Sequence, residues 1–391
     1  MKGFDSAMKN EINIGICGFG FMGRTHSFAV SSLPFFYSDV DSPLPFTARV
    51  KGVLNRSLEK SELVSREFSF EKAYSSFEEM LNDDSIDVID ICTPNIYHFD
   101  MIRAAISAGK HVYCEKPLCE SYDKAKTAAE LARNSASICS IVFNNRHLAA
   151  IKRAKQIIDS GAIGKIISFN FEYLHDSCTF PGKVPGWKQD AEICGDGGVL
   201  FDLGSHIIDL AVMLCGKISN VSARSQIAFP THPTKDGGQW ITNAGEAFYV
   251  IAETENGATG TLTASKIAKG TSDGLNFEVY GTNGALRFSL MEPGRLQYFD
   301  GSAPGEPIGG SSGFTTIECG GRSPAPAGIF PSPKASVGWL MGHIASMYNF
   351  LECVNSEKKC NPSFDDGAYV SAVMDSIMRS CRTGTNVKVT E

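Results

Sequence analysis

The sequence predicts an α/β protein in which a doubly wound parallel sheet is followed by an α+β domain with a large, mostly antiparallel open sheet. The chain of 391 residues is too long for one ordinary hydrophobic core. Strand and helix patterns alternate through residues 1–143, and strand patterns then follow one another with few helices between them. We therefore expect two domains, one at residues 1–143 and one at residues 144–391.

The first domain is predicted from apolar runs separated by amphipathic segments. Runs rich in β-branched residues predict strands at residues 12–17, 48–54, 86–92, 111–114 and 138–143. Helical spacing predicts helices at residues 24–30, 58–68, 96–108 and 121–134, and Gly109 stands where a helix stop is expected. Because helices separate the strands, the connections are expected to be right-handed crossovers and the sheet parallel.

The second domain begins with helix patterns at residues 148–160 and 199–215 and a strand pattern at 166–173. Further strand patterns lie at residues 221–229, 247–253, 258–265, 276–281 and 285–290, and residues 281–284 (Gly-Thr-Asn-Gly) predict a hairpin between the last two. Residues 293–336 are rich in Gly, Pro and Ser and predict a long loop, followed by helices at 337–355 and 365–382. This order is typical of an α+β domain.

Composition argues against several kinds of partner. The net charge is −7 and no block of basic residues is present, so we expect neither nucleic acid nor an anionic membrane as a partner. No apolar run approaches the ~20 residues that span a bilayer, and residues 1–11 lack the apolar stretch of a secretory signal. A cytoplasmic protein is therefore expected. The 12 cysteines form no C-x-x-C pair, and we expect buried thiols rather than disulfides or a structural zinc.

A glycine motif follows the first predicted strand. Residues 18–23 match G-x-G-x-x-G, and a helix pattern begins at Arg24. In this context the first glycine makes the turn, the second lets the backbone approach a pyrophosphate, and the third packs the helix against the strand. The helix N-terminus then favours the anion. The sequence predicts a Rossmann-type NAD(P) site, rather than a purely structural turn, at Gly18, Phe19, Gly20, Phe21, Met22 and Gly23.

The residues after the second strand bear on the choice between NAD and NADP. Folds that take NAD place an acidic residue there to bind the ribose hydroxyls. The corresponding residues here are Asn55, Arg56 and Ser57. They include no carboxylate to repel a 2′-phosphate, and the guanidinium of Arg56 is suited to pair with one. The sequence thus favours NADP and keeps NAD open; the alternative is that Arg56 is only a solvated residue at a helix start.

Two polar segments follow later strands of the predicted sheet. The first segment comes after the strand at 86–92, and the second comes after the strand at 111–114. In an open α/β sheet, ligands bind beyond the carboxyl ends of the strands. We therefore expect the cofactor, on the same rim as the glycine motif, to contact Thr93, Pro94, Asn95, His98, Glu115 and Lys116.

These segments, together with Asp202-x-x-x-His206, resemble the Gfo/Idh/MocA oxidoreductases. The resemblance covers nearly the whole chain, including residues 281–284 and 364–387. The segment inserted after Thr25-His26, and Trp187, are similar to the levoglucosan dehydrogenase and inositol dehydrogenase branch of that family.

The resemblance implies hydride transfer between a nicotinamide and a hydroxyl or carbonyl carbon of a sugar, anhydrosugar or polyol. It also implies a cis peptide bond between Lys116 and Pro117, and a homo-oligomer, a dimer or tetramer, formed through the second-domain sheet. Two other functions stay open. One is a family member that oxidises a glycoside transiently with bound NAD and no net redox change. The other is a non-catalytic regulator that binds the dinucleotide and a partner.

The resemblance gives catalytic roles to Lys116, Asp202 and His206. Oxidation of a hydroxyl needs a proton acceptor with a pKa near the working pH, and His206 meets this requirement at its unperturbed pKa. Asp202 stands one helical turn earlier on the same face, where it either orients the imidazole or binds a substrate hydroxyl. Lys116 is expected to stabilise charge on the reacting oxygen or to share in proton transfer. A metal held by Asp202, His206 and Asp209 is the less favoured alternative, so no metal is expected.

Five further residues are expected to contact the substrate. Asn144 and Arg146 end the last strand of the first domain, where the family contacts its substrate. Tyr173, His175 and Trp187 precede the catalytic helix with aromatic faces and polar groups suited to a sugar. Each of the five is also explained by packing alone, and neither His147 nor Lys188 is assigned a role.

Overall fold

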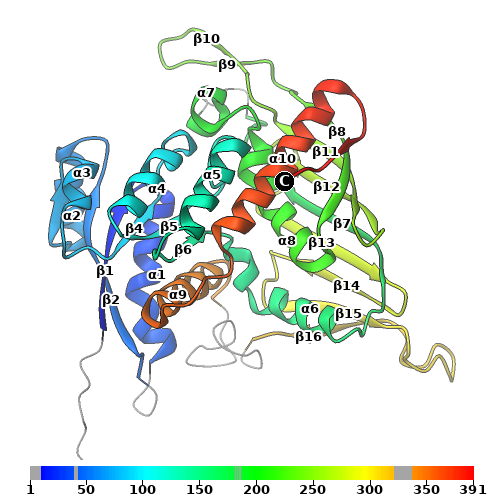
Figure 1. The fold of residues 1–391 in the computed structure, drawn as a ribbon. Helices are drawn as coiled ribbons and strands as arrows, with labels where there is room; N and C mark the ends of the chain where they lie inside the picture. Colours follow the sequence, from blue (N-terminus) through cyan, green and yellow to red (C-terminus); the bar gives the residue numbers. More distant parts are fainter. Residues whose placement is uncertain (1–9, 39–42, 181, 183, 185, 321–336) are drawn as a thin grey trace, which may run out of the picture.

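The first half of the chain forms a six-stranded parallel sheet with helices on both faces (Figure 1). The computed structural model describes residues 10–38, 43–180, 182, 184, 186–320 and 337–391. The strands are β1 (Asn10–Cys17), β2 (Phe46–Leu54), β3 (Lys72–Tyr74), β4 (Val88–Ile91), β5 (His111–Cys114) and β6 (Cys139–Ile141), in the spatial order β3-β2-β1-β4-β5-β6. The order reverses beside β1, so the carboxyl ends of β1 and β4 frame the crevice where such sheets bind ligands.

Helices α1 (Phe21–Tyr37), α2 (Leu58–Phe68), α3 (Phe77–Leu81), α4 (His98–Ser107) and α5 (Tyr122–Arg133) connect these strands. The predicted elements of this half are present, but α1 runs seven residues past the expected end at residue 30. Its extension carries Leu33 and Phe36, which are buried, and Pro34 lies within it. The short elements β3 and α3 were not predicted, because three and five residues are too few for a periodic pattern.

A nine-stranded, mostly antiparallel sheet forms the second half. Its spatial order is β16-β15-β14-β13-β7-β12-β11-β8-β17, and β7 and β12 run parallel. The strands are β7 (Ile166–Leu174), β8 (Ile218–Gln226), β11 (Ala247–Thr254), β12 (Thr259–Ser265), β13 (Gly274–Gly281), β14 (Gly284–Ser289), β15 (Arg295–Asp300), β16 (Phe314–Glu318) and β17 (Val387–Lys388). Strands β9 (Thr231–Pro233) and β10 (Gln239–Ile241) form a separate ribbon. The architecture confirms the predicted fold class.

One face of the large sheet is covered by α6 (Ala149–Asp159), α8 (Ser205–Cys215) and α10 (Phe364–Thr383), as Figure 1 shows. Apolar side chains of these helices and of the strands are buried in one cluster. The other face remains open, and it exposes Tyr249 and Ile251 of β11. The short helix α7 (Ala191–Cys194) lies ahead of α8.

Helix α9 (Leu340–Ser356) leaves the second half and packs against the first sheet. Its Ile344, Met347 and Phe350 are buried in a cluster with Ile14 of β1 and Leu33 of α1. The chain thus crosses back to the parallel sheet before α10 returns to the large one (Figure 1).

The predicted loop at residues 293–336 is wrong in part. Strands β15 and β16 lie within it and extend the large sheet, because Leu296 is fully buried and continues the core despite the surrounding Gly and Pro. Residues 321–336 of that prediction lie outside the described residues. No helix in the described part of the chain is long and apolar enough to cross a membrane.

Candidate active site

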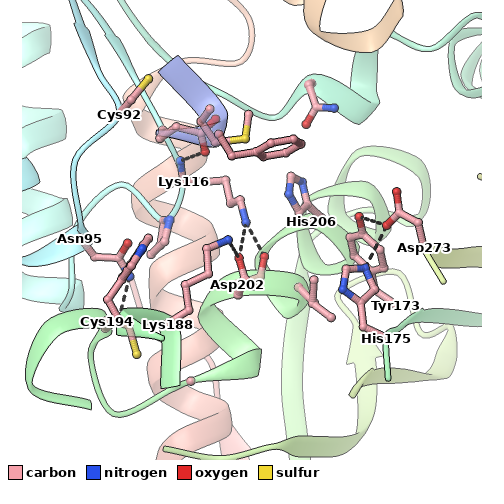
Figure 2. A pocket seen from close by; sticks show the side chains of 18 of the residues that line it. Cys92, Asn95, Lys116, Tyr173, His175, Lys188, Cys194, Asp202, His206 and Asp273 are labelled. Carbon is pink, nitrogen blue, oxygen red and sulfur yellow. Dashed lines mark hydrogen bonds and ion pairs between the residues drawn. The ribbon is translucent and has the colours of Figure 1, made fainter. Parts of the chain in front are cut away.

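A cavity of about 340 Å³ lies beyond the carboxyl ends of β4 and β5, facing the start of α8 (Figure 2). It brings together most of the residues that the sequence singled out for the chemistry and the substrate. These are Phe21, Met22, Thr93, Asn95, Glu115, Lys116, Asn144, Tyr173, His175, Trp187, Asp202 and His206.

The glycine turn is shaped for a dinucleotide. Gly18 has φ +89°, and a Cβ there would lie 2.8 Å from the carbonyl oxygen of Cys92. A Cβ on Gly23 would lie 2.3 Å from the carbonyl oxygen of Gly18, whereas a Cβ on Gly20 would meet no atom within 4 Å. Helix α1 begins next to Gly20 with no side-chain cap and no acidic residue in its first turn. The open space and the helix N-terminus therefore fit a pyrophosphate.

Asn55 and Ser57 have structural contacts beside this turn. The side-chain oxygen of Asn55 accepts a hydrogen bond from the backbone N–H of Phe19 at 3.1 Å. Ser57 caps α2 by accepting from the backbone N–H of Lys60 at 3.4 Å. Phe19 is buried with its ring packed edge-on against Phe68 at 4.8 Å. Arg56 is exposed at the start of α2, a position that suits either a phosphate or solvent.

His98 connects the two rim segments and does not line the cavity. Its Nε2 lies 2.8 Å from the carbonyl oxygen of Thr93, and its Nδ1 lies 3.0 Å from the carbonyl oxygen of Pro117. Because the ring is fully buried, the pKa of His98 is lowered. The Lys116–Pro117 peptide bond is cis, as the family resemblance implied. His98 thus fixes the distance between the segments that were expected to meet the cofactor.

Asp202 lies at the centre of the cavity and is contacted by three lysines. Lys116 donates to the Asp202 carbonyl oxygen at 2.5 Å and to Oδ1 at 3.1 Å, as Figure 2 shows. Lys188 lies 2.7 Å from Oδ1 and Lys266 2.9 Å from Oδ2. Burial opposes the charge on Asp202, but Lys188, Lys266 and Lys116 together hold its pKa well below the usual value. Burial also lowers the pKa of Lys116.

His206 stands in the first turn of α8, directly after a π-helical turn at Leu200–Gly204 that carries Asp202. Its Nδ1 lies 3.4 Å from the amide nitrogen of Asn145, and the contacts of Asp202 are with lysines rather than with the imidazole. The sequence assumed an unperturbed pKa, and the structure corrects this. Burial, followed by repulsion from Lys116, lowers the pKa of His206 well below 6.5. The imidazole is therefore neutral at pH 7 and has a lone pair to accept a proton.

Asp273 joins two of the expected substrate residues. Its Oδ1 accepts from the hydroxyl of Tyr173 at 2.6 Å and lies 2.9 Å from Nε2 of His175 (Figure 2). Burial opposes its charge, but the hydrogen bonds from His175 and Tyr173 lower the pKa of Asp273. Trp187 is 40% exposed at the edge of the cavity. This side of the cavity thus offers aromatic faces and fixed polar groups.

Arg146 does not line the cavity, contrary to its expected contact with substrate. Its Nε lies 2.9 Å from both carboxylate oxygens of Asp209, its Nη2 3.0 Å from Asp366, and its Nη1 2.8 Å from Asn361. A buried guanidinium has to be paired, and these partners occupy its donors. Asp209, which was the candidate third ligand of the less favoured metal site, is therefore paired with Arg146.

Several cavity residues were missed by sequence reasoning. Trp339, which directly precedes α9, and His343 of α9 also line the cavity, and Trp339 stacks on Phe21 with ring centroids 5.8 Å apart. Asp273 comes from the loop before β13, and Lys266, which contacts Asp202 without lining the cavity, directly follows β12. No local pattern marks these positions, because only the packing of distant elements brings them to the cavity.

Comparison with known proteins agrees with this geometry. The model of the oxidoreductase family with an NAD-binding Rossmann fold matches residues 12–143, and that of the GFO/IDH/MocA C-terminal domain matches residues 151–287. Levoglucosan dehydrogenase of Pseudarthrobacter phenanthrenivorans is 30% identical over 383 residues, or 95% of this chain and 96% of that protein. The scyllo-inositol 2-dehydrogenase (NAD(+)) of Bacillus subtilis is 30% identical over 281 residues, or 71% of this chain and 74% of that protein.

A solved structure described as levoglucosan dehydrogenase in complex with NADH and levoglucosan has the same fold. Its TM-score is 0.91 at 30% identity, over 98% of this chain and 100% of that one. The resemblance stated from the motifs is thereby confirmed. The chain belongs to the Gfo/Idh/MocA family of NAD-binding oxidoreductases, as an NAD-dependent dehydrogenase that acts on alcohol groups.

Proposed function

We propose that this dehydrogenase interconverts the hydroxyl and carbonyl forms of a neutral sugar, anhydrosugar or polyol. The observation that carries the proposal is that Lys116, Asp202 and His206 line one cavity with Phe21 and Met22 of the glycine turn. The names of the relatives, which act on levoglucosan and scyllo-inositol, support this substrate class. The hydroxyl and aromatic groups of Tyr173 and Trp187 suit the alternating polar and apolar surface of a sugar ring.

The chemistry of the cavity follows from its charges. A bound nicotinamide would accept the hydride from the carbon that carries the reacting hydroxyl. His206 is neutral and takes the hydroxyl proton as that bond breaks. The ammonium of Lys116 donates a hydrogen bond to the same oxygen and stabilises the negative charge that develops there. Asp202 holds Lys116 in place through the contacts described above, and its ionised carboxylate is able to accept from a second substrate hydroxyl.

The direct test mixes the protein with NAD or NADP and a panel of sugars, anhydrosugars and inositols. Growth of absorbance at the reduced-nicotinamide band is expected with at least one polyol. Absence of any change with every compound would contradict the proposal. A glycosidase that uses NAD transiently is the second candidate, and it would release a leaving group without accumulating reduced cofactor. A non-catalytic regulator would do neither.

We further propose that Arg56 pairs with the 2′-phosphate of NADP. Its support is the exposed guanidinium at the start of α2 and the absence of a carboxylate at Asn55, Arg56 and Ser57. The dissociation constants of NADP and NAD are compared in the wild type and in Arg56→Ala. The variant is expected to lose affinity for NADP by about tenfold, with little change for NAD. An unchanged ratio would contradict the proposed pairing of Arg56 with the 2′-phosphate.

We also propose that the chain divides into domains at residues 1–143 and 144–391. We propose further that the large sheet forms the contact of a homo-oligomer. Support for the second comes from the open face of that sheet, where Tyr249 is 47% and Ile251 56% exposed. Exposed aromatic and aliphatic side chains on a broad sheet face are typical of subunit contacts.

A further inference from the structure

A buried histidine lies between two carboxylates beneath the cavity. His26 of α1 is 1% exposed, and its Nδ1 lies 3.0 Å from both oxygens of Asp90 on β4. On the opposite edge of the ring, Nε2 lies 3.3 Å from Oε1 of Glu115. This second contact is off the line of a good hydrogen bond, so we treat it as an ion pair. No role in binding or chemistry has so far been attached to His26.

The contacts on both edges of the ring define its charge. A neutral imidazole would turn a lone pair toward one of the two carboxylates, whereas an imidazolium presents an N–H to each. The titratable groups that face the ring are Asp90, Cys92, Tyr113, Glu115 and His343. Burial opposes a charge on the ring, but the attraction of Asp90 prevails and raises the pKa of His26 well above its usual value.

The same donors do not form a convincing metal site. Among the described residues, His26, Asp90 and Cys92 have ligand atoms within 4.8 Å of one another. Both carboxylate oxygens of Asp90 and the sulfur of Cys92 lie against Nδ1 of His26. Glu115, the next candidate ligand, faces the other ring nitrogen and points away from that position. A zinc ion needs a fourth ligand on the same side, so the arrangement favours a proton on Nδ1 over a metal.

Glu115 transmits this charge to the cavity. Its Oε2 accepts a hydrogen bond from the backbone N–H of Lys116 at 3.1 Å, and the residue itself lines the cavity. Burial opposes ionisation, but His26 and then Lys116 lower the pKa of Glu115 to about 2. Burial lowers the pKa of both Lys116 and His206, and the negative charge of Glu115 opposes part of that lowering.

We propose that His26 is a positioning residue: its imidazolium, neutralised on one side by Asp90, keeps Glu115 ionised and directed at the main chain of Lys116. The role in turnover rests on the proposed function, since it concerns the lysine assigned to the reacting oxygen. The charge state of His26 itself is independent of any substrate.

The first experiment measures that charge state directly. Nitrogen NMR of the full chain with ¹⁵N-labelled histidine, compared with His26→Gln to assign the signal, is recorded at pH 7.5. Two protonated ring nitrogens are expected for His26. A signal of a neutral imidazole would overturn the proposal, as would zinc that copurifies with the wild type and is absent from Cys92→Ser.

The second experiment uses the pH dependence of kcat/KM in His26→Gln, Glu115→Gln and the double variant between pH 5.5 and 7.5. Without the imidazolium, Glu115 loses its strongest stabilising partner and is expected to titrate in this range. His26→Gln should therefore lose up to about tenfold in kcat/KM per pH unit below the new pKa, relative to the wild-type profile. This loss of kcat/KM at low pH should be absent from Glu115→Gln and from the double variant, because neither variant has a carboxyl group at residue 115.

His147→Gln is the matched control, because His147 is a buried histidine that does not line the cavity. This variant is expected to lower stability without adding a fall of kcat/KM at low pH. If kcat/KM fell in the same way in His147→Gln, or still fell in the double variant, His26 would have only a structural role. If no sugar is oxidised by the wild type, the same comparison is made on the dissociation constant of NAD, so the two proposals fail separately.

Discussion

Asp202 shows how a single residue organises the charge of this cavity. Three lysines contact this one carboxylate, and their attraction keeps it ionised despite its burial. The low pKa makes Asp202 a weak proton acceptor, so its proposed role is to hold Lys116 in place. The imidazole of His206, lowered in pKa by burial and by Lys116, is neutral and is the proposed proton acceptor.

Replacement of His206 by alanine tests this assignment. His206→Ala is expected to lower turnover by ~10²–10⁴-fold, because proton transfer then depends on water. Affinity for the reduced cofactor, measured by its fluorescence, should change little. His147→Ala serves as the control for loss of a buried histidine. A His206→Ala variant with near-normal turnover would place the proton acceptor elsewhere.

In the turn between β1 and α1, two glycines are needed for different reasons. Gly23 is required by the protein itself, since a Cβ there would lie 2.3 Å from the carbonyl oxygen of Gly18. Gly20 has open space around it in the protein, so its requirement comes from the ligand. The same motif thus contains one position that serves folding and one that serves binding.

This separation predicts different losses for two small substitutions. Gly20→Ala is expected to retain the melting temperature and to weaken dinucleotide binding by about tenfold or more, because the methyl group occupies the space that the pyrophosphate approaches. Gly23→Ala is expected to lower the melting temperature, since the backbone has to shift to relieve the contact. Thermal unfolding and a cofactor titration on both variants check the pair. Equal losses of stability would contradict the distinction.

Elements with strong periodicity were predictable, and the walls of the cavity were only partly so. The sequence places α2 at residues 58–68, as observed, because its helical pattern is bounded by a Ser cap. It places Lys116 and His206 in one site through motifs. Trp339 and His343 were not predictable, because their position depends on α9 packing against α1 rather than on any local pattern. Lys266 likewise looks like an ordinary strand-end lysine until Asp202 is placed beside it.

For the whole molecule, the buried histidines set the response to acid. The pKa is lowered by burial in four fully buried histidines, His98, His147, His206 and His343. Each takes up a proton near pH 6.5 in the unfolded chain and only at a lower pH in the folded one. The unfolded state therefore binds more protons, and stability falls as the pH falls below about 6.5. His26, with its raised pKa, gives the opposite slope near pH 6.5, because the folded state already holds that proton while the unfolded chain is still taking it up.

A measurement of melting temperature between pH 7.5 and 5 checks this expectation. The free energy of unfolding should decline by up to about 1.4 kcal/mol per pH unit for each of these histidines. His147→Leu removes one of these groups and should make the decline less steep, at some cost in stability at pH 7.5. A slope unchanged in that variant would contradict the assignment for His147.

The open face of the large sheet bears on assembly. Its Tyr249 and Ile251 are exposed on the side away from α8 and α10. Light scattering of the wild type is expected to give a dimer or tetramer, and Ile251→Lys should shift it toward the monomer, because a charge is costly within such a contact. Ile241→Lys, at an exposed residue of the separate ribbon, is the matched control and should leave the assembly unchanged. A wild-type monomer would rule out the proposed interface.

Helix α9 also determines how this protein can be recombined with its relatives. An exchange of halves cut at a single point after β6 would separate Ile344, Met347 and Phe350 from the surface of β1 and α1 that buries them. The transplanted first half would expose an apolar patch, and the cavity would lose Trp339 and His343. A chimera that transfers α9 together with the parallel sheet keeps both the packing and the cavity wall from one parent. Engineering of cofactor or substrate choice by module exchange therefore needs two crossovers rather than one.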